Sequence, residues 1–222
     1  MAFYANEGKK ALEALTSQKE NFTDETPIRI SGLSDHWTQM PYGSLKKLAS
    51  NSIYQLTNQV FTMVYGNFEA FILDLVHDSL ISVGAEEPQT EAIRMTMMTR
   101  WQGKIDRMRE KFSLDMPQRT FREEFSDMRM EFLGERCTNP IELLEKLAEF
   151  RHRLVHSAGR ADGPFLKSFP TVPFAEGEQI RMPTSLPFDL HYFFVPFTDI
   201  IDSAFAKRFN WPRLPFAPER FL

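Results

Sequence analysis

The sequence predicts an all-α protein, a helical bundle with one long central helix and a proline-rich irregular insertion. Apolar residues recur at every third or fourth position through most of the chain, which is the period of an amphipathic helix. One such stretch continues without interruption from Pro41 to Val83. The insertion is indicated by five prolines between residues 160 and 190, where no regular apolar pattern occurs.

The composition is that of an ordinary globular protein. The 222 residues are 42% hydrophobic and 25% charged, and the formal net charge is −4. A chain of this length can bury one sizeable core, so we expect a single domain over residues 1–222. The sequence has no run of about 18 apolar residues and no apolar signal segment at its start. We therefore expect a cytoplasmic protein that has no membrane partner.

The expected elements divide the chain into four parts. An N-terminal helix and loop cover residues 1–40, with a short extended piece at 28–30, and core helices cover 41–159. The irregular insertion covers 160–190, with a small hairpin around residues 174–182, and a C-terminal helix and tail cover 191–222. Helices are expected at about residues 3–20, 41–83, 89–112, 118–133, 140–157 and 191–209.

The long stretch from Pro41 to Val83 has two interpretations. It predicts one helix of about forty residues, or two helices that break near Gly66, because glycine costs roughly 1 kcal/mol in a helix interior relative to alanine. Two acidic residues within it, Glu69 and Asp74, are either polar members of an active site at a subunit interface or solvated acids on an outer face.

The helix expected at residues 89–112 carries positive charge opposite its apolar side. Six basic and two acidic residues share that side, a surplus of four positive charges. This stripe either follows a phosphate backbone or is a solvated face balanced by other helices. Its basic members are Arg94, Arg100, Lys104, Arg107, Arg109 and Lys111.

Cys137 is the only cysteine in the chain, which excludes an intramolecular disulfide and a cysteine-rich zinc site. No neighbouring sequence feature argues for an activated thiol. We expect Cys137 to be a small apolar residue between helices.

The helix expected at residues 140–157 ends in a cationic segment. Asn139 and Pro140 form a helix start signal, and Gly159 forms a stop signal. The ten residues from 150 to 159 contain two histidines and two arginines but no acid. His152 and His156 are four positions and about 40° apart, so they share a face. Arg151 is roughly 140° from His156, although its long side chain can reach a ligand bound near that imidazole.

The segment Arg151-His152-Arg153-Leu154-Val155-His156 is an Arg-x4-His pattern with a polar residue directly after the arginine. It resembles the signature of HEPN domains, an all-helical superfamily that contains many metal-independent ribonucleases. The tail from Ser157 to Asp162 resembles the form that the motif takes in several prokaryotic branches. Upstream, Tyr65 to Phe71 is similar to the aromatic-Glu segment on an early long helix of these proteins. The resemblance covers roughly residues 41 to 210.

This resemblance implies an endoribonuclease that cleaves RNA by attack of the 2′-OH and leaves a 2′,3′-cyclic phosphate, without a metal or another cofactor. Arg151 would bind the scissile phosphate, and His156 would act as general acid or base. His152 would be the supporting polar residue, and Arg153 and Arg160 would bind flanking RNA phosphates. The residue types suit these roles, since histidine has an unperturbed pKa of about 6.5 and the guanidinium fork matches phosphate oxygens.

The same resemblance implies a homodimer in which two motif helices form a composite active site. RNA would be one partner, and an inhibitor or other protein a second. A toxin or antiviral-defence role is what the family suggests.

Three other interpretations of the motif stay open. In the first, the protein is a non-catalytic HEPN-like module that binds a nucleotide or regulates a partner. Alternatively, His152 and His156 bind a metal ion, because their i, i+4 spacing is that of a ligand pair, although the sequence marks no third ligand. Finally, the basic residues complement the dipole at the carboxyl end of the helix and have no further role.

Overall fold

A computed structural model of the chain describes residues 23–25, 27–31, 37–97, 100–126, 128, 130–183 and 185–212. Most of the described residues are helical, so the predicted all-α class is confirmed. The helix expected at residues 3–20 and the tail from residue 213 lie outside the described residues. None of the described helices has the length and apolar character needed to cross a membrane.

The chain divides into two compact units, one of residues 1–58 with 181–184 and the other of residues 59–180 with 185–222. In the first unit, β1 (Pro27–Ser31) pairs with β2 (Trp37–Pro41) as an antiparallel hairpin. The expected extended piece at 28–30 therefore exists, but its pairing with a second strand was not predicted. An ion pair between Lys46 Nζ and Asp24 Oδ1, 2.5 Å long, joins the segment before β1 to the helix that follows β2.

The long helix α2 (Tyr42–Ser82) begins directly after β2 and has no break. The single-helix interpretation of this stretch is therefore confirmed. Gly66 lies inside the helix, and nothing lies within 4 Å of the place where its Cβ would be. The helix tolerates this glycine because the apolar residues on either side of it, including Phe61 and Phe68, are buried in the core of the second unit.

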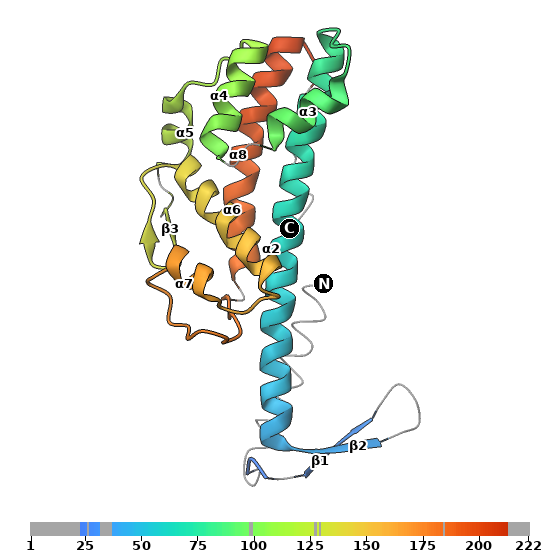
Figure 1. Cartoon of the computed structure of the whole chain (residues 1–222), viewed down its shortest axis with the longest axis vertical. Helices are drawn as coiled ribbons and strands as arrows, with labels where there is room; N and C mark the ends of the chain where they lie inside the picture. Colours follow the sequence, from blue (N-terminus) through green and yellow to red (C-terminus); the bar gives the residue numbers. More distant parts are fainter. Residues whose placement is uncertain are drawn as a thin grey trace. The chain divides into compact units, whose positions relative to one another are not determined.

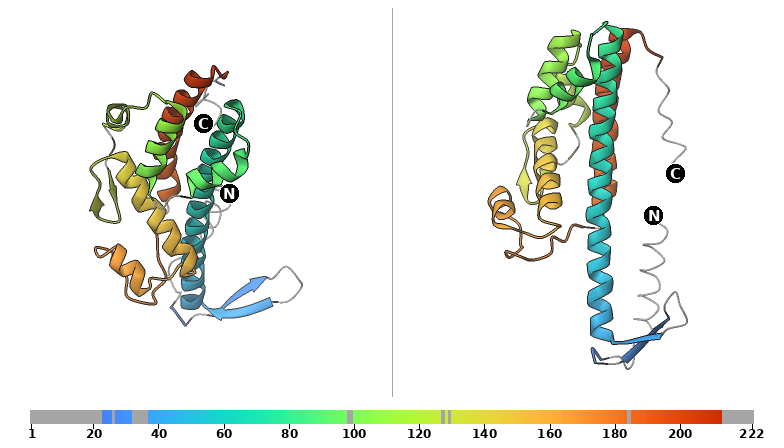
Figure 2. Two further views of the ribbon diagram at one scale, coloured as in Figure 1. Left: turned by 45° about the horizontal axis from the view of Figure 1, so that its top comes forward. Right: turned by 45° about the vertical axis from the view of Figure 1, so that its right-hand side comes forward.

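The core of the second unit is formed largely by aromatic side chains. Figures 1 and 2 show the second half of α2 beside α8 (Leu186–Phe209), and the ring centroids of Phe68 and Phe194 lie 4.7 Å apart at this contact. A third helix, α6 (Pro140–His156), packs on α2 through Phe150, whose ring lies edge-on to Phe61 at 5.1 Å. Such pairs contribute about 0.5–1.5 kcal/mol beyond the burial of their surface.

The prediction of one helix at residues 89–112 was wrong. The structure has two helices in this region, α3 (Pro88–Thr96) and α4 (Trp101–Phe112). The backbone of Arg100 is extended, with φ −120° and ψ 133°, so α4 starts in a new direction at Trp101. The side chain of Trp101 is only 1% exposed, so the first residue of α4 lies in the core of the second unit.

The prediction of a helix at residues 118–133 was also wrong beyond its first half. The helix α5 (Gln118–Glu124) is short, and a small hairpin of β3 (Glu131–Phe132) and β4 (Glu135–Arg136) follows it. Leu133 and Gly134 form the turn with φ values of 52° and 81°, as tight two-residue hairpins require. Thr171 Oγ1 supports the turn by donating a hydrogen bond to the Leu133 carbonyl at 2.7 Å.

Up to residue 183 the insertion is irregular, as predicted, except for the short helix α7 (Gly163–Ser168). Its last residues belong to α8, which begins at Leu186 rather than near residue 191 as predicted. Asp162 caps this helix by accepting a hydrogen bond from the Phe165 amide at 2.7 Å. Within the described residues the hairpin expected around 174–182 does not form. A single bridge between Arg160 and Gln179 closes the insertion instead.

Candidate functional site

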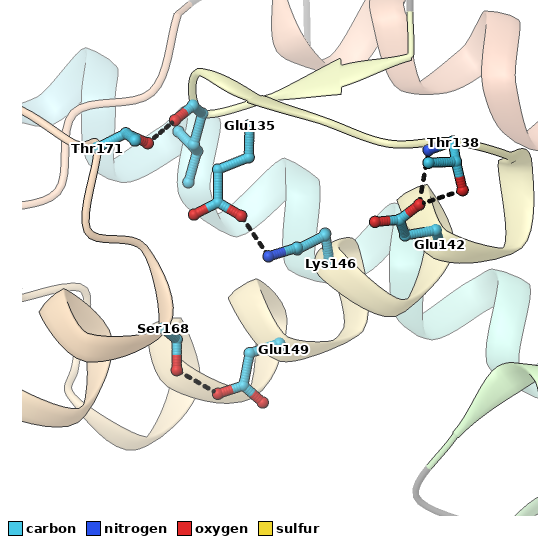
Figure 3. Close-up of polar contacts among 8 residues, drawn as sticks. Glu135, Thr138, Glu142, Lys146, Glu149, Ser168 and Thr171 are labelled. Atoms are coloured by element: carbon cyan, nitrogen blue, oxygen red, sulfur yellow. Dashed lines mark hydrogen bonds and ion pairs between the residues drawn. The ribbon is translucent and has the colours of Figure 1, made fainter.

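The helix α6 carries all the predicted site residues except Arg160, and its start is the predicted one. Asn139 Oδ1 accepts a hydrogen bond from the Glu142 amide at 3.0 Å. Glu142 Oε2 in return accepts hydrogen bonds from Thr138, from the backbone amide at 2.6 Å and from the hydroxyl at 2.7 Å (Figure 3). These hydrogen bonds lower the pKa of the Glu142 carboxyl below its ordinary value. The local sequence thus determines where α6 begins.

Two further polar contacts attach α6 to its neighbours. Lys146 forms an ion pair with Glu135 of β4, and Ser168 at the end of α7 donates a hydrogen bond to Glu149 Oε1 at 2.9 Å (Figure 3). The β3–β4 hairpin and α7 therefore both contact α6. These contacts restrain the helix before its last turn.

The end of α6 also follows the prediction. The Ser157 amide donates to the Arg153 carbonyl and the Gly159 amide donates to the Leu154 carbonyl, each at 2.9 Å. Ala158 and Gly159 both have positive φ, 51° and 75°, which reverses the chain at the end of the helix. This stop leaves the last turn of α6 at the surface.

His152 and His156 are both exposed on this last turn, and their rings lie beside each other. The ring centroids are 4.3 Å apart and the ring planes are inclined by 54°. The prediction that the two histidines share a face is confirmed. Two adjacent imidazoles at the surface are accessible to a large substrate.

Arg151 points to a different side of α6. Its side chain is half-buried, and its Nε atom is buried without a hydrogen-bond partner among the described residues. Its positive charge acts on the hydroxyl of Tyr65 in α2. In the described part of the chain, no hydrogen bond joins Arg151 to His152 or His156. The structure thus places Arg151 towards α2 and the histidine pair towards solvent.

The two arginines predicted to bind flanking phosphates have different surroundings. Arg153 Nε donates a hydrogen bond to Glu149 Oε1 at 2.7 Å, so an acid neutralises its charge. Burial alone would raise the pKa of Glu149, but hydrogen bonds from Ser168 and Arg153 and the charge of Arg153 together lower it. Arg160 is exposed and donates to the Gly177 carbonyl at 3.0 Å. It pairs with no acid in the described ranges.

A buried polar cluster from α2 and α4 lies in the same unit. Tyr65 Oη accepts a hydrogen bond from Trp101 Nε1 at 2.6 Å. Lys104 Nζ lies 4.1 Å from the centre of the Trp101 ring and 4.0 Å from Glu69 Oε1. Burial lowers the pKa of Lys104, and the carboxylates of Glu69 and Glu145 oppose this effect. The sequence pointed to Tyr65 only through the resemblance and to Glu69 also as a candidate polar residue of the long helix, and it did not predict this cluster.

The six basic residues of the predicted stripe, between Arg94 and Lys111, do not all lie on a positively charged surface. Lys104 is 8% exposed and therefore does not belong to the surface. Lys111 pairs with Glu91 at 2.6 Å, and Arg109 lies 3.6 Å from Asp106. Acids thus balance part of the predicted positive face.

A metal site has little support among the described residues. No group of three or more histidine, cysteine, aspartate or glutamate side chains is arranged there to hold an ion. His152 and His156 would supply two ligands only.

Cys137 is buried, and burial raises the pKa of its thiol to about 11. It is the small apolar residue that the sequence predicted.

A cleft of about 540 Å³ lies at the opposite end of α6 from the histidine pair. Its lining includes two arginines, Arg122 and Arg136, and one acid, Glu131, together with Phe125, Met130 and Asn139. Neither arginine forms an ion pair with an acid in the described part of the chain. None of the predicted site residues lies in this cleft.

Comparisons of the chain with protein-family models, with curated proteins and with solved structures gave no match. The resemblance to HEPN domains therefore stays a prediction based on the segment Arg151 to His156 and on Tyr65 to Phe71. What the protein does has to be inferred from the chemistry of its own residues.

Proposed function

We propose that this protein is a metal-independent endoribonuclease of the HEPN type. The observation that carries the proposal is the exposed pair of imidazoles at the end of α6, with ring centroids 4.3 Å apart. The half-buried Arg151 directly precedes the first of them in the sequence. A general acid, a general base and a phosphate-binding cation are the groups that cleavage of RNA without a metal requires.

In the proposed reaction, the 2′-oxygen of the substrate forms a bond to the adjacent phosphorus and the bond to the 5′-oxygen breaks. One imidazole takes the proton of the 2′-OH, and a second imidazole donates a proton to the leaving oxygen. His156 is one of this pair. The other is His152 of the same chain or a histidine of a second subunit. Arg151 stabilises the charge on the phosphoryl oxygens. The products are a 2′,3′-cyclic phosphate and a 5′-hydroxyl.

The proposal includes a homodimer in which two α6 ends meet. Val155 lies on the same last turn as the two histidines and is 49% exposed. Single exposed apolar side chains are common on protein surfaces, so the proposed dimer rests on the resemblance to HEPN domains rather than on this valine. Arg160, whose charge has no acid partner in the described ranges, would contact a flanking phosphate. A role as a toxin or in antiviral defence, with an inhibitor or partner protein, follows from the same resemblance.

The decisive experiment is incubation of the purified protein with mixed cellular RNA in excess EDTA, followed by mapping of the new ends. We expect cyclic-phosphate ends from the wild type and none from His156→Ala. His191→Ala is the matched control, because His191 is an exposed histidine on α8 and is not part of the Arg-x4-His segment. The proposal fails if the wild type leaves RNA intact, or if His156→Ala cleaves as fast as the control variant.

The cleft at the start of α6 favours a second function, a non-catalytic module that binds a nucleotide. Two arginines without a described acid partner, beside the apolar Phe125 and Met130, suit a phosphate group attached to a flat base. Titration with ATP would test this function. Binding that Arg122→Ala and Arg136→Ala abolish, in a protein that leaves RNA intact, would replace the ribonuclease proposal.

A further inference from the structure

The two exposed histidines of α6 lie one helical turn apart. They are separated by four positions in the sequence, so both side chains leave the helix on the same face. Their ring centroids are 4.3 Å apart, and the ring planes are inclined by 54°. Both residues are exposed, so a small ion in solution can reach the two rings together.

The separation of the rings is close to that of two imidazoles bound to one metal ion. A histidine nitrogen lies about 2.0–2.1 Å from a bound zinc ion, so two rings that share an ion have centroids roughly 4.5–5 Å apart. The observed 4.3 Å is within 1 Å of this range, a difference that rotation about the side-chain bonds can supply. Histidines at i, i+4 on one helix face are a known pair of zinc ligands.

The charged residues beside the pair leave it able to bind a cation. The charge of Arg153 is neutralised by Glu149, which accepts a hydrogen bond from its Nε at 2.7 Å. Glu149 is three positions before His152, so its carboxylate lies on the same side of α6 as the two rings. Arg151 lies on a different side of the helix, roughly 140° from His156.

The pair forms an open site rather than a closed one. In the described part of the chain no third histidine, cysteine, aspartate or glutamate is arranged to hold the same ion. Glu149 Oε1 is held by Arg153 and by Ser168. Water therefore completes the coordination, and the ion can exchange. Imidazole ligands suit Zn²⁺, Cu²⁺ and Ni²⁺, whereas Mg²⁺ and Ca²⁺ prefer oxygen.

We propose that His152 and His156 together chelate a divalent transition-metal ion such as Zn²⁺, and that the bound ion inhibits the protein. A ring nitrogen that binds a metal has no lone pair left for a proton, so a chelated imidazole cannot use that nitrogen as a general acid or base. The inhibition rests on the proposed ribonuclease function, whereas the chelation does not.

The first test measures binding without RNA. Zn²⁺ is titrated into the untagged full-length protein and followed by calorimetry. Two ligands fixed on one helix act at a high effective concentration, so loss of either should weaken binding at least about tenfold. His152→Ala and His156→Ala should both show this loss. His77→Ala is the matched control, because His77 is on α2 and its Nδ1 lies 3.3 Å from Asp78 Oδ1.

The second test measures RNA cleavage at increasing Zn²⁺ concentration, for the wild type and His77→Ala, beside a reaction without protein. We expect cleavage to be lost at the Zn²⁺ concentrations that saturate the histidine pair and to return when excess EDTA is added. Mg²⁺ at the same concentrations should leave the rate unchanged, because imidazole is a poor ligand for it.

The outcomes separate this inference from the proposed function. Undetectable Zn²⁺ binding by the wild type overturns the chelation, and so does binding that only one of the two histidine substitutions weakens. If the wild type does not cleave RNA, the ribonuclease proposal fails, the inhibition fails with it, and the titration alone decides the chelation. A wild type that cleaves RNA equally fast with its histidine pair saturated overturns the inhibition.

Discussion

The imidazole rings of His152 and His156 lie side by side with centroids 4.3 Å apart on the exposed last turn of α6. Arg151 precedes them in the chain but turns its side chain into the protein, where its Nε is buried. The motif thus has an outer part formed by the two histidines and an inner part formed by the arginine. Substitutions of the two parts should therefore have different consequences.

Substitution of His156 should remove activity without affecting stability. We expect His156→Ala to lower the rate of RNA cleavage by at least about 10²-fold, since a general acid or base typically contributes that much. Its melting temperature should match the wild type, because the side chain is exposed. Rate measurements in EDTA and thermal unfolding by circular dichroism check both expectations. A large loss of helix in His156→Ala would mark the histidine as structural instead.

Arg160 should contribute more to RNA affinity than Arg153. The charge of Arg153 is neutralised by Glu149, whereas Arg160 pairs with no acid in the described ranges. In a His156→Ala background, Arg160→Ala should reduce the slope of log affinity against log salt by about 0.7, the value for one single-strand phosphate contact. Arg153→Ala should change the slope less. Equal slopes for both variants would exclude this difference in role.

The cap at the start of α6 should make stability depend on pH. Hydrogen bonds from Thr138 lower the pKa of Glu142 below its ordinary value of 4.5. A lowered folded-state pKa contributes stability that is present above the unfolded value and is lost as pH falls through the folded value. At pH 7, Glu142→Gln should be less stable than the wild type by up to about 1 kcal/mol, since the cap is partly exposed.

Urea unfolding at a series of pH values between 7 and 3 measures this difference. We expect the gap between the wild type and Glu142→Gln to narrow as the pH falls below about 4.5. Glu110→Gln is the control, because Glu110 is an exposed acid whose side chain forms no ion pair in the described part of the chain. A gap that stays constant across the pH range would contradict the assignment of this stability to the ionised carboxyl.

Two glycines should respond in opposite ways to substitution by alanine. Gly66 lies inside α2 with open space around it, so Gly66→Ala should stabilise the protein by about 0.5–1 kcal/mol. Gly134 has a φ of +81°, and a Cβ there would lie 3.3 Å from Thr171 Oγ1. Gly134→Ala should destabilise the protein by about 1–2 kcal/mol. Thermal unfolding of the two variants compares them directly, and shifts of the same sign would be contrary to expectation.

The helix that carries the motif could be predicted closely because its signals are local. Asn139 and Pro140 start α6, the turn at Gly159 ends it, and each acts through residues a few positions away. The spacing of His152 and His156 was enough to predict a shared face, since four residues make slightly more than one helical turn. The single helix α2 also followed from a periodicity that Gly66 did not interrupt.

The helices predicted at residues 89–112 and 118–133 were both wrong for the same reason. Apolar periodicity continues through Arg100 and through Leu133, so it gives no sign that the chain turns at these points. The turn at Arg100 accompanies burial of Trp101, and the turn at Leu133 is supported by Thr171, 38 residues away. Contacts between residues so distant along the chain leave no local pattern.

The same reason explains what the sequence could not say about the candidate site. The hydrogen bond between Trp101 and Tyr65 spans 36 residues, and it joins two helices whose packing no local pattern predicts. Lys104 belonged to a basic stripe in the sequence and lies in the core of the protein. Local hydrogen bonds and helical spacing thus specify the motif helix and its histidine pair. The surroundings of Arg151 depend on how α2, α4 and α6 pack, because burial of their side chains is a property of the assembled unit.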